Sequence, residues 1–237
     1  MPALTLQVGI AKTGKYASRE SGDTIEVVER PAGGISVVVV DGQGSGRAAK
    51  SLSMIVSARA VSMLSEGVRD GAVVRGLNDI LFAMRHGQVS ASLDLLSIDM
   101  KTQSLVISRM SVTPLVVRSG GEFVVLAPTE RPLGVHHLAG PEVQEWALEP
   151  GMVVIACTDG VTGSGKKGGL GEFDLARWLY DQSANLSAEQ LAEAALDEAL
   201  RRDGAKAGDD MAIAVLRVVD GATEPIIRRL TVDLPLG

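Results

Sequence analysis

The sequence of 237 residues predicts an α+β fold, in which antiparallel strands form a sandwich that also carries helices. Ten short apolar stretches are rich in β-branched residues or alternate in polarity, and Gly, Pro or Ser turns separate most of them. Helical periodicity is confined to two regions, and each region holds two consecutive helices. Strands joined by tight turns favour antiparallel sheets over a series of βαβ crossovers.

The predicted strands follow one another along most of the chain. They span Leu4–Ile10, Thr24–Glu29, Ile35–Val40, Leu93–Ile98, Leu105–Met110, Leu115–Arg118, Phe123–Leu126, Val143–Leu148, Met152–Cys157 and Met211–Val219. Three of the segments between strands are typical of hairpins, namely Lys101–Ser104, Ser119–Gly121 and Glu149–Gly151. Near the C-terminus, the alternation in Pro225–Pro235 favours one added edge strand.

The predicted helices form two consecutive pairs. The first pair spans Arg47–Glu66 and Ala72–Arg85, and the second spans Phe173–Asp181 and Ala188–Arg202. Ser187 precedes the last helix as a candidate N-cap, with Gln190 at the position that completes a capping box. Gly204 follows the basic end of the same helix, as expected for a helix C-terminus.

Composition and charge exclude several protein classes. The hydrophobic content of 46%, with no linker or repeat, predicts one domain over residues 1–237. No apolar run approaches the ~18 residues of a membrane helix, and MPALTLQVGI lacks the features of a signal peptide. The net charge of −6 and the scarcity of aromatic residues argue against nucleic-acid binding. Because a single cysteine, Cys157, cannot form an internal disulfide, the sequence predicts a cytoplasmic protein. The apolar runs, the charge and the aromatic content together predict that it binds neither membranes nor nucleic acids.

Glycine-rich segments give a first hypothesis for function. Gly9–Lys15 and Gly160–Lys166 both have the spacing of a phosphate-binding P-loop up to its lysine. The next residue should be Ser or Thr, to bind Mg²⁺, but it is Tyr16 in one segment and Lys167 in the other. A P-loop nucleotide-binding protein therefore stays only as an alternative.

Aspartates at strand ends and in glycine turns give a second hypothesis. Asp23 precedes a predicted strand, Asp41 and Asp159 each end one before a glycine, and Asp209 and Asp210 begin another. Carboxylates fixed by strands are suitable ligands for hard divalent cations, and the glycines let a carbonyl or a water approach closely. Because clustered carboxylates repel one another, such a cluster implies two metal ions bridged by one carboxylate.

The order of these motifs resembles a known family. S-G-D, then D-G-x-G-S-G before an Ala- and Ser-rich helix, then T-D-G-V and G-D-D-M, resemble the PPM (protein phosphatase type 2C) family of metal-dependent serine/threonine phosphatases. Ser111–Arg118 and Arg131–Gly134 are similar to mid-domain segments of its short bacterial SpoIIE/RsbX branch. The resemblance spans about residues 15–219, with 220–237 as a C-terminal extension. It implies a four-layer αββα sandwich, with two antiparallel sheets flanked by helix pairs.

The resemblance implies a role for each acidic residue. Asp41 would bridge two metal ions, and the carbonyl of Gly42 would bind one of them. Asp159 and Asp209 would complete the ligands of the first ion. Asp23 would hold the second ion, largely through water. Because the site offers no imidazole or thiolate, the two ions are expected to be Mn²⁺ or Mg²⁺.

Three further residues belong to the predicted site. Asp210 and Ser45 would contact the metal-binding residues without binding the ions themselves. Arg19 is a candidate phosphate-binding residue. A hydroxide bridging the two ions would attack the phosphorus in line, with no covalent phosphoenzyme.

The resemblance implies a phosphatase that acts on phosphoserine or phosphothreonine of a regulatory protein, of the STAS-domain or stressosome partner-switching type. A stand-alone catalytic domain is expected, because no sensor or transmembrane region is recognised. The alternative in the same fold is a catalytically inactive module that binds a phosphoprotein. Residues 163–171 directly follow the Asp159 motif and are predicted to form a mobile flap beside the site.

Overall fold

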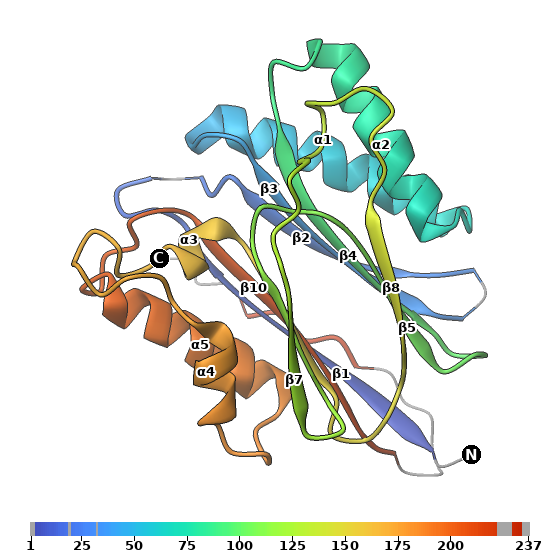
Figure 1. Ribbon diagram of the computed structural model, residues 1–237, viewed down its shortest axis with the longest axis vertical. Helices are drawn as coiled ribbons and strands as arrows, with labels where there is room; N and C mark the ends of the chain where they lie inside the picture. Colours follow the sequence, from blue (N-terminus) through green and yellow to red (C-terminus); the bar gives the residue numbers. More distant parts are fainter. Residues whose placement is uncertain (1–2, 19, 32, 222–228, 234–237) are drawn as a thin grey trace.

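The computed structural model describes residues 3–18, 20–31, 33–221 and 229–233. In this part of the chain, two five-stranded antiparallel sheets lie face to face, and helices cover the outer face of each sheet (Figure 1). The predicted α+β fold with four αββα layers is therefore confirmed. Within the same residues, no helix combines the length and the apolar character that crossing a bilayer requires.

The two sheets draw their strands from both halves of the chain. One sheet has the order β1 (Leu4–Thr13), β10 (Met211–Asp220), β9 (Val153–Cys157), β6 (Leu115–Ser119) and β7 (Glu122–Leu126). The other has the order β2 (Asp23–Glu29), β3 (Ile35–Gly42), β4 (Ala91–Asp99), β5 (Ser104–Met110) and β8 (Glu142–Ala147). The first and last strands of the described residues, β1 and β10, thus pair with each other, with β1 at the edge of the sheet.

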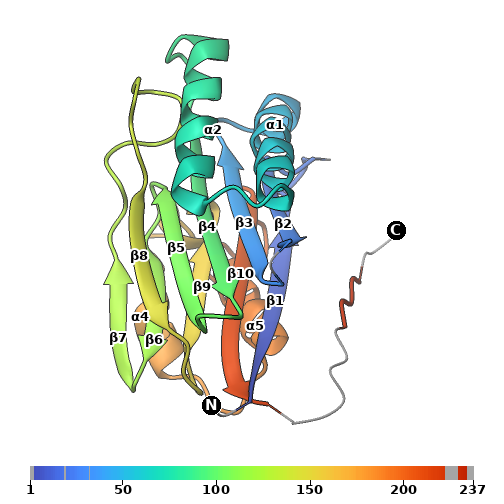
Figure 2. The ribbon, with the colours of Figure 1, turned by 90° about the vertical axis from the view of Figure 1, so that its right-hand side faces the viewer.

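Helices pack on the outer faces of the sheets. The helices α1 (Gly46–Ser65) and α2 (Asp70–Arg85) cover β2 to β5, and α5 (Ala188–Arg202) covers β1 and β10. The shorter helices are α3 (Asp159–Thr162) and α4 (Leu175–Tyr180). Figure 2 shows α1 and α2 on one side of the paired sheets, with α4 and α5 on the other. The predicted capping box of α5 is confirmed, because the side chains of Ser187 and Gln190 each accept the other's backbone N–H.

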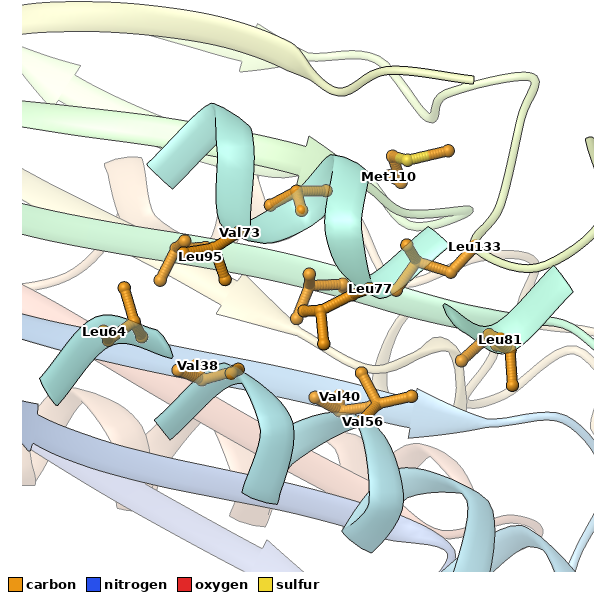
Figure 3. Close-up of a cluster of buried hydrophobic side chains, with 14 of the residues drawn as sticks. Val38, Val40, Val56, Leu64, Val73, Leu77, Leu81, Leu95, Met110 and Leu133 are labelled. Atoms are coloured by element: carbon orange, nitrogen blue, oxygen red, sulfur yellow. The ribbon is translucent and has the colours of Figure 1, made fainter. Parts of the chain in front are cut away.

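Three hydrophobic layers hold the four structural layers together. Strand β4 shows how one strand serves two of them, since alternate side chains point to opposite faces of a sheet. Leu95 packs beneath α1 and α2 (Figure 3), and Leu93 belongs to the same cluster. Leu96 and Ile98 pack between the two sheets. A third layer joins α4 and α5 to the other sheet. Each fully buried aliphatic side chain stabilises the fold by about 1.5–3 kcal/mol, so the three layers fix the strand ends firmly.

The structure corrects the sequence prediction at one turn and adds one short helix. Glu149–Gly151 is not a hairpin turn, because β8 pairs with β5 while β9 pairs with β10 and β6 in the other sheet. The four-residue helix α3 was not predicted, because one turn is too short to show helical periodicity. Most of the strand predicted at Pro225–Pro235 lies outside the described residues, and residues 229–233 form no strand.

Candidate active site

Five aspartates gather at one end of the sandwich, where strand ends from both sheets meet. The antiparallel register of β2 and β3 sets Asp23 opposite Asp41. Asp159 follows β9 as the first residue of α3, and Asp209 and Asp210 directly precede the neighbouring strand β10. All five aspartates line one cavity of about 180 Å³. The structure thus brings together every acidic residue that the sequence singled out.

Burial and mutual repulsion dominate the electrostatics of this cavity. Desolvation, followed by the charge of Asp159, raises the pKa of Asp41 from 3.8 to about 8. Desolvation also raises the pKa of Asp23 to about 6, although a hydrogen bond from Thr158 opposes the rise. The pKa of Asp159 is raised by desolvation and by Asp209. The cavity therefore disfavours carboxylate charge unless a cation compensates for it.

The donor set fits hard divalent cations. Neither histidine nor cysteine is among the described residues that line the cavity, so its charged ligands are all oxygens. Within the described ranges, no three acidic, histidine or cysteine side chains are placed so that they could hold one ion by themselves. Mg²⁺ usually keeps several waters and binds proteins through only one or two carboxylates. The placement of the aspartates therefore agrees with ions that keep part of their water shell.

Asp210 anchors the loop between β1 and β2. Its Oδ1 accepts the backbone N–H of Lys15 at 2.8 Å, and its Oδ2 accepts that of Gly22, also at 2.8 Å. A Cβ on Gly22 would lie 2.9 Å from the Cβ of Ala49, so glycine permits this close approach. Because both oxygens of Asp210 are engaged with the backbone, its position supports the predicted role behind the metal ligands.

Thr158 orients the neighbouring carboxylate of Asp23. Its hydroxyl donates to Asp23 Oδ2 at 2.7 Å and accepts the backbone N–H of Ala212 at 2.9 Å. Both side chains are buried, and the hydrogen bond joins one sheet to the other. Sequence reasoning included Thr158 in the T-D-G motif but missed this role. The sequence signal that could have indicated this role is the position of Thr158, a hydroxyl residue at a strand end directly before Asp159.

Two lysines lie behind Asp23 and were also missed. Lys12 Nζ donates to the carbonyl oxygen of Asp23 at 2.9 Å, and Lys50 Nζ donates to the same oxygen at 3.0 Å. Burial and the charge of Lys50 lower the pKa of Lys12. The two positive charges partly offset the acidic cluster, yet both hydrogen bonds go to the backbone. No local pattern marks these lysines, because they reach Asp23 from different elements.

Glycines let two backbones approach closely at the site. A Cβ on Gly42 would lie 2.3 Å from the carbonyl oxygen of Ala49, and one on Gly160 would lie 1.9 Å from that of Asp210. Gly42 therefore has a packing reason to be glycine. The role of its carbonyl as a metal ligand stays a prediction.

One predicted residue that the structure describes, Ser45, is not among those that line the cavity. The chain turns at Gly44, whose φ is +99°, so that Gly44 lines the cavity while the next residue, Ser45, is exposed. In the described structure, Ser45 occupies the N-cap position of α1 without a side-chain capping hydrogen bond. This position does not support the role of Ser45 near the metal ligands, which stays a prediction. Arg19 lies outside the described residues.

Neither P-loop-like segment forms a phosphate-binding loop. Residues 9–13 belong to β1 and pair with β10. In the second segment, the amides of residues 163, 164 and 166 donate to carbonyls of residues 159, 161 and 163. The amide of Gly165 donates to Asp203 Oδ1 at 2.8 Å. A P-loop directs such amides at phosphate, so this geometry opposes the nucleotide-binding alternative.

Cys157 is not a candidate nucleophile. It is buried in β9, and desolvation raises the pKa of its thiol, which disfavours the reactive thiolate.

The raised pKa values predict an unusual pH dependence for the metal-free chain. A carboxyl whose pKa is higher in the folded state contributes stability below its unfolded pKa, and the contribution is lost as pH rises through the folded pKa. With chelator present, we expect the melting temperature to fall between about pH 4 and about pH 8, where folded Asp23 and Asp41 keep protons that the unfolded chain has lost, and to level off above this range. Asp41→Asn should flatten the upper part of this curve. A melting temperature that rises for the wild type over this range would contradict the assignment.

Comparisons with known proteins identify the family of this chain and agree with its fold. The family model described as "Stage II sporulation protein E (SpoIIE)" matches residues 31–219. Two curated relatives are both named Stage II sporulation protein E. The protein from Priestia megaterium is 22% identical over 91% of this chain, and that from Bacillus subtilis (strain 168) is 23% identical over 90%. The chain spans only 37% and 26%, respectively, of the lengths of these relatives.

Solved structures show the same fold. A structure of the PP2C phosphatase domain and a regulatory fragment of SpoIIE from Bacillus subtilis has a TM-score of 0.80 and 22% identity, covering 94% of this chain and 65% of that one. RsbX in complex with magnesium has a TM-score of 0.70 and 17% identity, covering 92% and 100%. A structure from a study of the bacterial stressosome has a TM-score of 0.70 and 21% identity, covering 90% and 100%.

Proposed function

Because the chain belongs to the SpoIIE family, we propose that it is a metal-dependent protein serine/threonine phosphatase acting on phosphoserine or phosphothreonine. The observation that carries the proposal is the cavity lined by five aspartates. The shared core between the two sheets supports the prediction of one phosphatase domain over residues 1–237. An inactive phosphoprotein-binding module is disfavoured, because all the acidic positions implied by the family pattern are present.

Four aspartates of the cavity would hold the metal ions in this proposal. Asp41, Asp159 and Asp209 would contribute to a first Mn²⁺ or Mg²⁺ ion, and Asp23 with Asp41 to a second. Bound waters would complete both coordination shells, because no three described side chains are placed to hold one ion by themselves. When bound, two such ions supply a water of lowered pKa as nucleophile and neutralise the phosphoryl oxygens. Asp41 lies opposite Asp23 on the paired strands, which supports a bridging position.

The neighbouring residues fix this arrangement before substrate arrives. Thr158 holds one oxygen of Asp23 and so restricts its rotamer. Asp210 holds the β1–β2 loop through Lys15 and Gly22, and therefore sets the start of β2. Such pre-organisation lowers the reorganisation needed when charge develops on the phosphoryl group.

The substrate is proposed to be a phosphorylated regulatory protein of the STAS-domain or stressosome type. Support comes from the structural likeness to RsbX and to the protein from the stressosome study, and it is an analogy of fold. The cytoplasmic setting expected from the single cysteine stays a prediction.

Phosphate release tests the proposed function. Purified chain is stripped with chelator and assayed on a phosphoserine peptide and on p-nitrophenyl phosphate, with Mn²⁺, with Mg²⁺ and with neither. We expect release only with a divalent cation. Tight binding of the phosphopeptide without release under every metal condition would contradict the enzyme and support the binding module.

A further inference from the structure

The acidic cavity has to accept a group that is itself negatively charged. A phosphoserine or phosphothreonine carries a charge of about −1.5 to −2 at pH 7. Metal ions neutralise only the phosphoryl oxygens that they contact, so the other oxygens need hydrogen-bond donors from the protein. No arginine or lysine is among the described residues that line the cavity, and its uncharged side-chain donors are Gln43, Ser90 and Ser92.

Gln43 is anchored to Ser90 through both its backbone and its side chain. It directly follows β3, whose last residue, Gly42, pairs with Ala91 of β4. The backbone N–H of Gln43 donates to the carbonyl oxygen of Ser90 at 3.1 Å, and the backbone N–H of Ser90 donates to Gln43 Oε1 at 2.8 Å. A backbone N–H can be accepted only by the oxygen of a carboxamide, so this contact identifies which end of the side chain is the nitrogen.

The amide nitrogen of Gln43 is left as a donor. In the described part of the chain, Nε2 has no hydrogen-bond partner, and Gln43 is exposed at the cavity. A free carboxamide presents its oxygen as readily as its nitrogen, but here the backbone of Ser90 holds the oxygen. The group that remains to meet an anion is therefore the one that can donate to it.

The two serines are less suited to this task. Ser92 Oγ accepts the backbone N–H of Val112 at 3.3 Å, and Ser92 is only 8% exposed. The hydroxyl of Ser90 can rotate, so it can turn a lone pair toward the cavity as easily as its proton. Only Gln43 combines an engaged acceptor with a free donor among these three side chains.

We propose that Gln43 is a phosphate-binding residue, whose Nε2–H donates to a phosphoryl oxygen of the substrate and of the released phosphate. The inference rests on the proposed phosphatase function and adds a neutral substrate-binding group to it. Neutrality suits this cavity, because an arginine or lysine here would pair with the aspartates and compete with the metal ions.

Gln43→Glu separates the donor from the anchor. The carboxylate still accepts the N–H of Ser90, but it donates no hydrogen bond and repels phosphate. Gln43→Met removes the donor and the anchor together. At saturating Mn²⁺, we expect kcat/KM to fall about two- to tenfold in Gln43→Met, the scale of one neutral hydrogen bond, and further in Gln43→Glu.

The substrates and the product identify which group Gln43 contacts. The fall should be equal on a phosphoserine peptide and on p-nitrophenyl phosphate, because these substrates share only the phosphoryl group. In titration calorimetry of the Mn²⁺-loaded chain with inorganic phosphate, Kd should rise in both variants by a similar factor.

Gln144→Glu is the matched control, because it makes the same chemical change at an exposed position of the edge strand β8. This variant should keep wild-type kcat/KM and phosphate affinity. Unchanged values in both Gln43 variants, with an active wild type, would overturn the inference alone. A loss confined to the phosphopeptide would overturn it by placing Gln43 against the polypeptide. A loss in Gln43→Met that is absent in Gln43→Glu would overturn it by showing that only the anchor matters. A wild type without turnover on either substrate would instead contradict the proposed function, and the inference would fall with it.

Discussion

Asp41→Asn is expected to lower metal-dependent phosphate release by at least about a hundredfold, the scale of removing one electrostatic group from a reacting centre. Asp41 lies at the middle of the acidic cluster, and its pKa responds to all four of the other aspartates. Asparagine keeps the size of the side chain but removes the charge that would bridge the two cations.

The same substitution should leave the fold intact. Because burial and repulsion raise the pKa of Asp41 to about 8, a neutral side chain removes an unfavourable charge above that pH. We therefore expect the metal-free variant to melt no lower than the wild type at about pH 9. Asp197→Asn, on the exposed side of α5, is the matched control and should retain full activity. Wild-type activity in the Asp41→Asn variant would contradict the proposed site.

Arg109→Met is expected to destabilise the fold by about 3–5 kcal/mol, because it leaves the carboxylate of Asp94 buried without its charged partner. Arg109 Nε donates to Asp94 Oδ1 at 2.9 Å, and both side chains are only 2% exposed. The guanidinium also donates to the carbonyl oxygens of Leu126, at 2.9 Å, and of Thr113. Arg109 thus joins β5 to the segment that leads into β6 and carries Val112 to the cavity.

Urea unfolding of a double-mutant cycle measures this effect. Asp94→Leu combined with Arg109→Met removes both charges, so the double variant should regain part of the stability lost in Arg109→Met alone. Recovery should be incomplete, because the carbonyls that Arg109 satisfied lose their donor. A loss below about 1 kcal/mol for Arg109→Met would show that the buried pair does not hold this segment.

Local patterns were sufficient to predict most of the fold. Strands are predicted by alternating apolar and polar residues, and long helices by an apolar period of 3.6 residues. The Ser187–Gln190 capping box is another local signal, and the structure confirms it. Turn chemistry alone could not assign strands to sheets. The turn at Glu149–Gly151 has the composition of a hairpin, but β8 and β9 find their partners in different sheets. That choice depends on packing between distant segments, which no short window contains.

In the candidate site too, local patterns identified the residues but not the contacts between distant segments. Each aspartate was found because a glycine or a strand end lies beside it in the sequence. The contacts that position these aspartates join residues far apart in the chain, such as Thr158 to Asp23 and Asp210 to Gly22. Ser45 was assigned by family pattern, but the turn at Gly44 leaves it facing solvent.

Anomalous diffraction from crystals grown with Mn²⁺ tests the central claim most directly. We expect two manganese peaks within about 4 Å of each other in the aspartate-lined cavity, with the carboxylate of Asp41 contacting both. A cavity without manganese at saturating Mn²⁺, or a single ion that does not contact Asp41, would contradict the two-metal account.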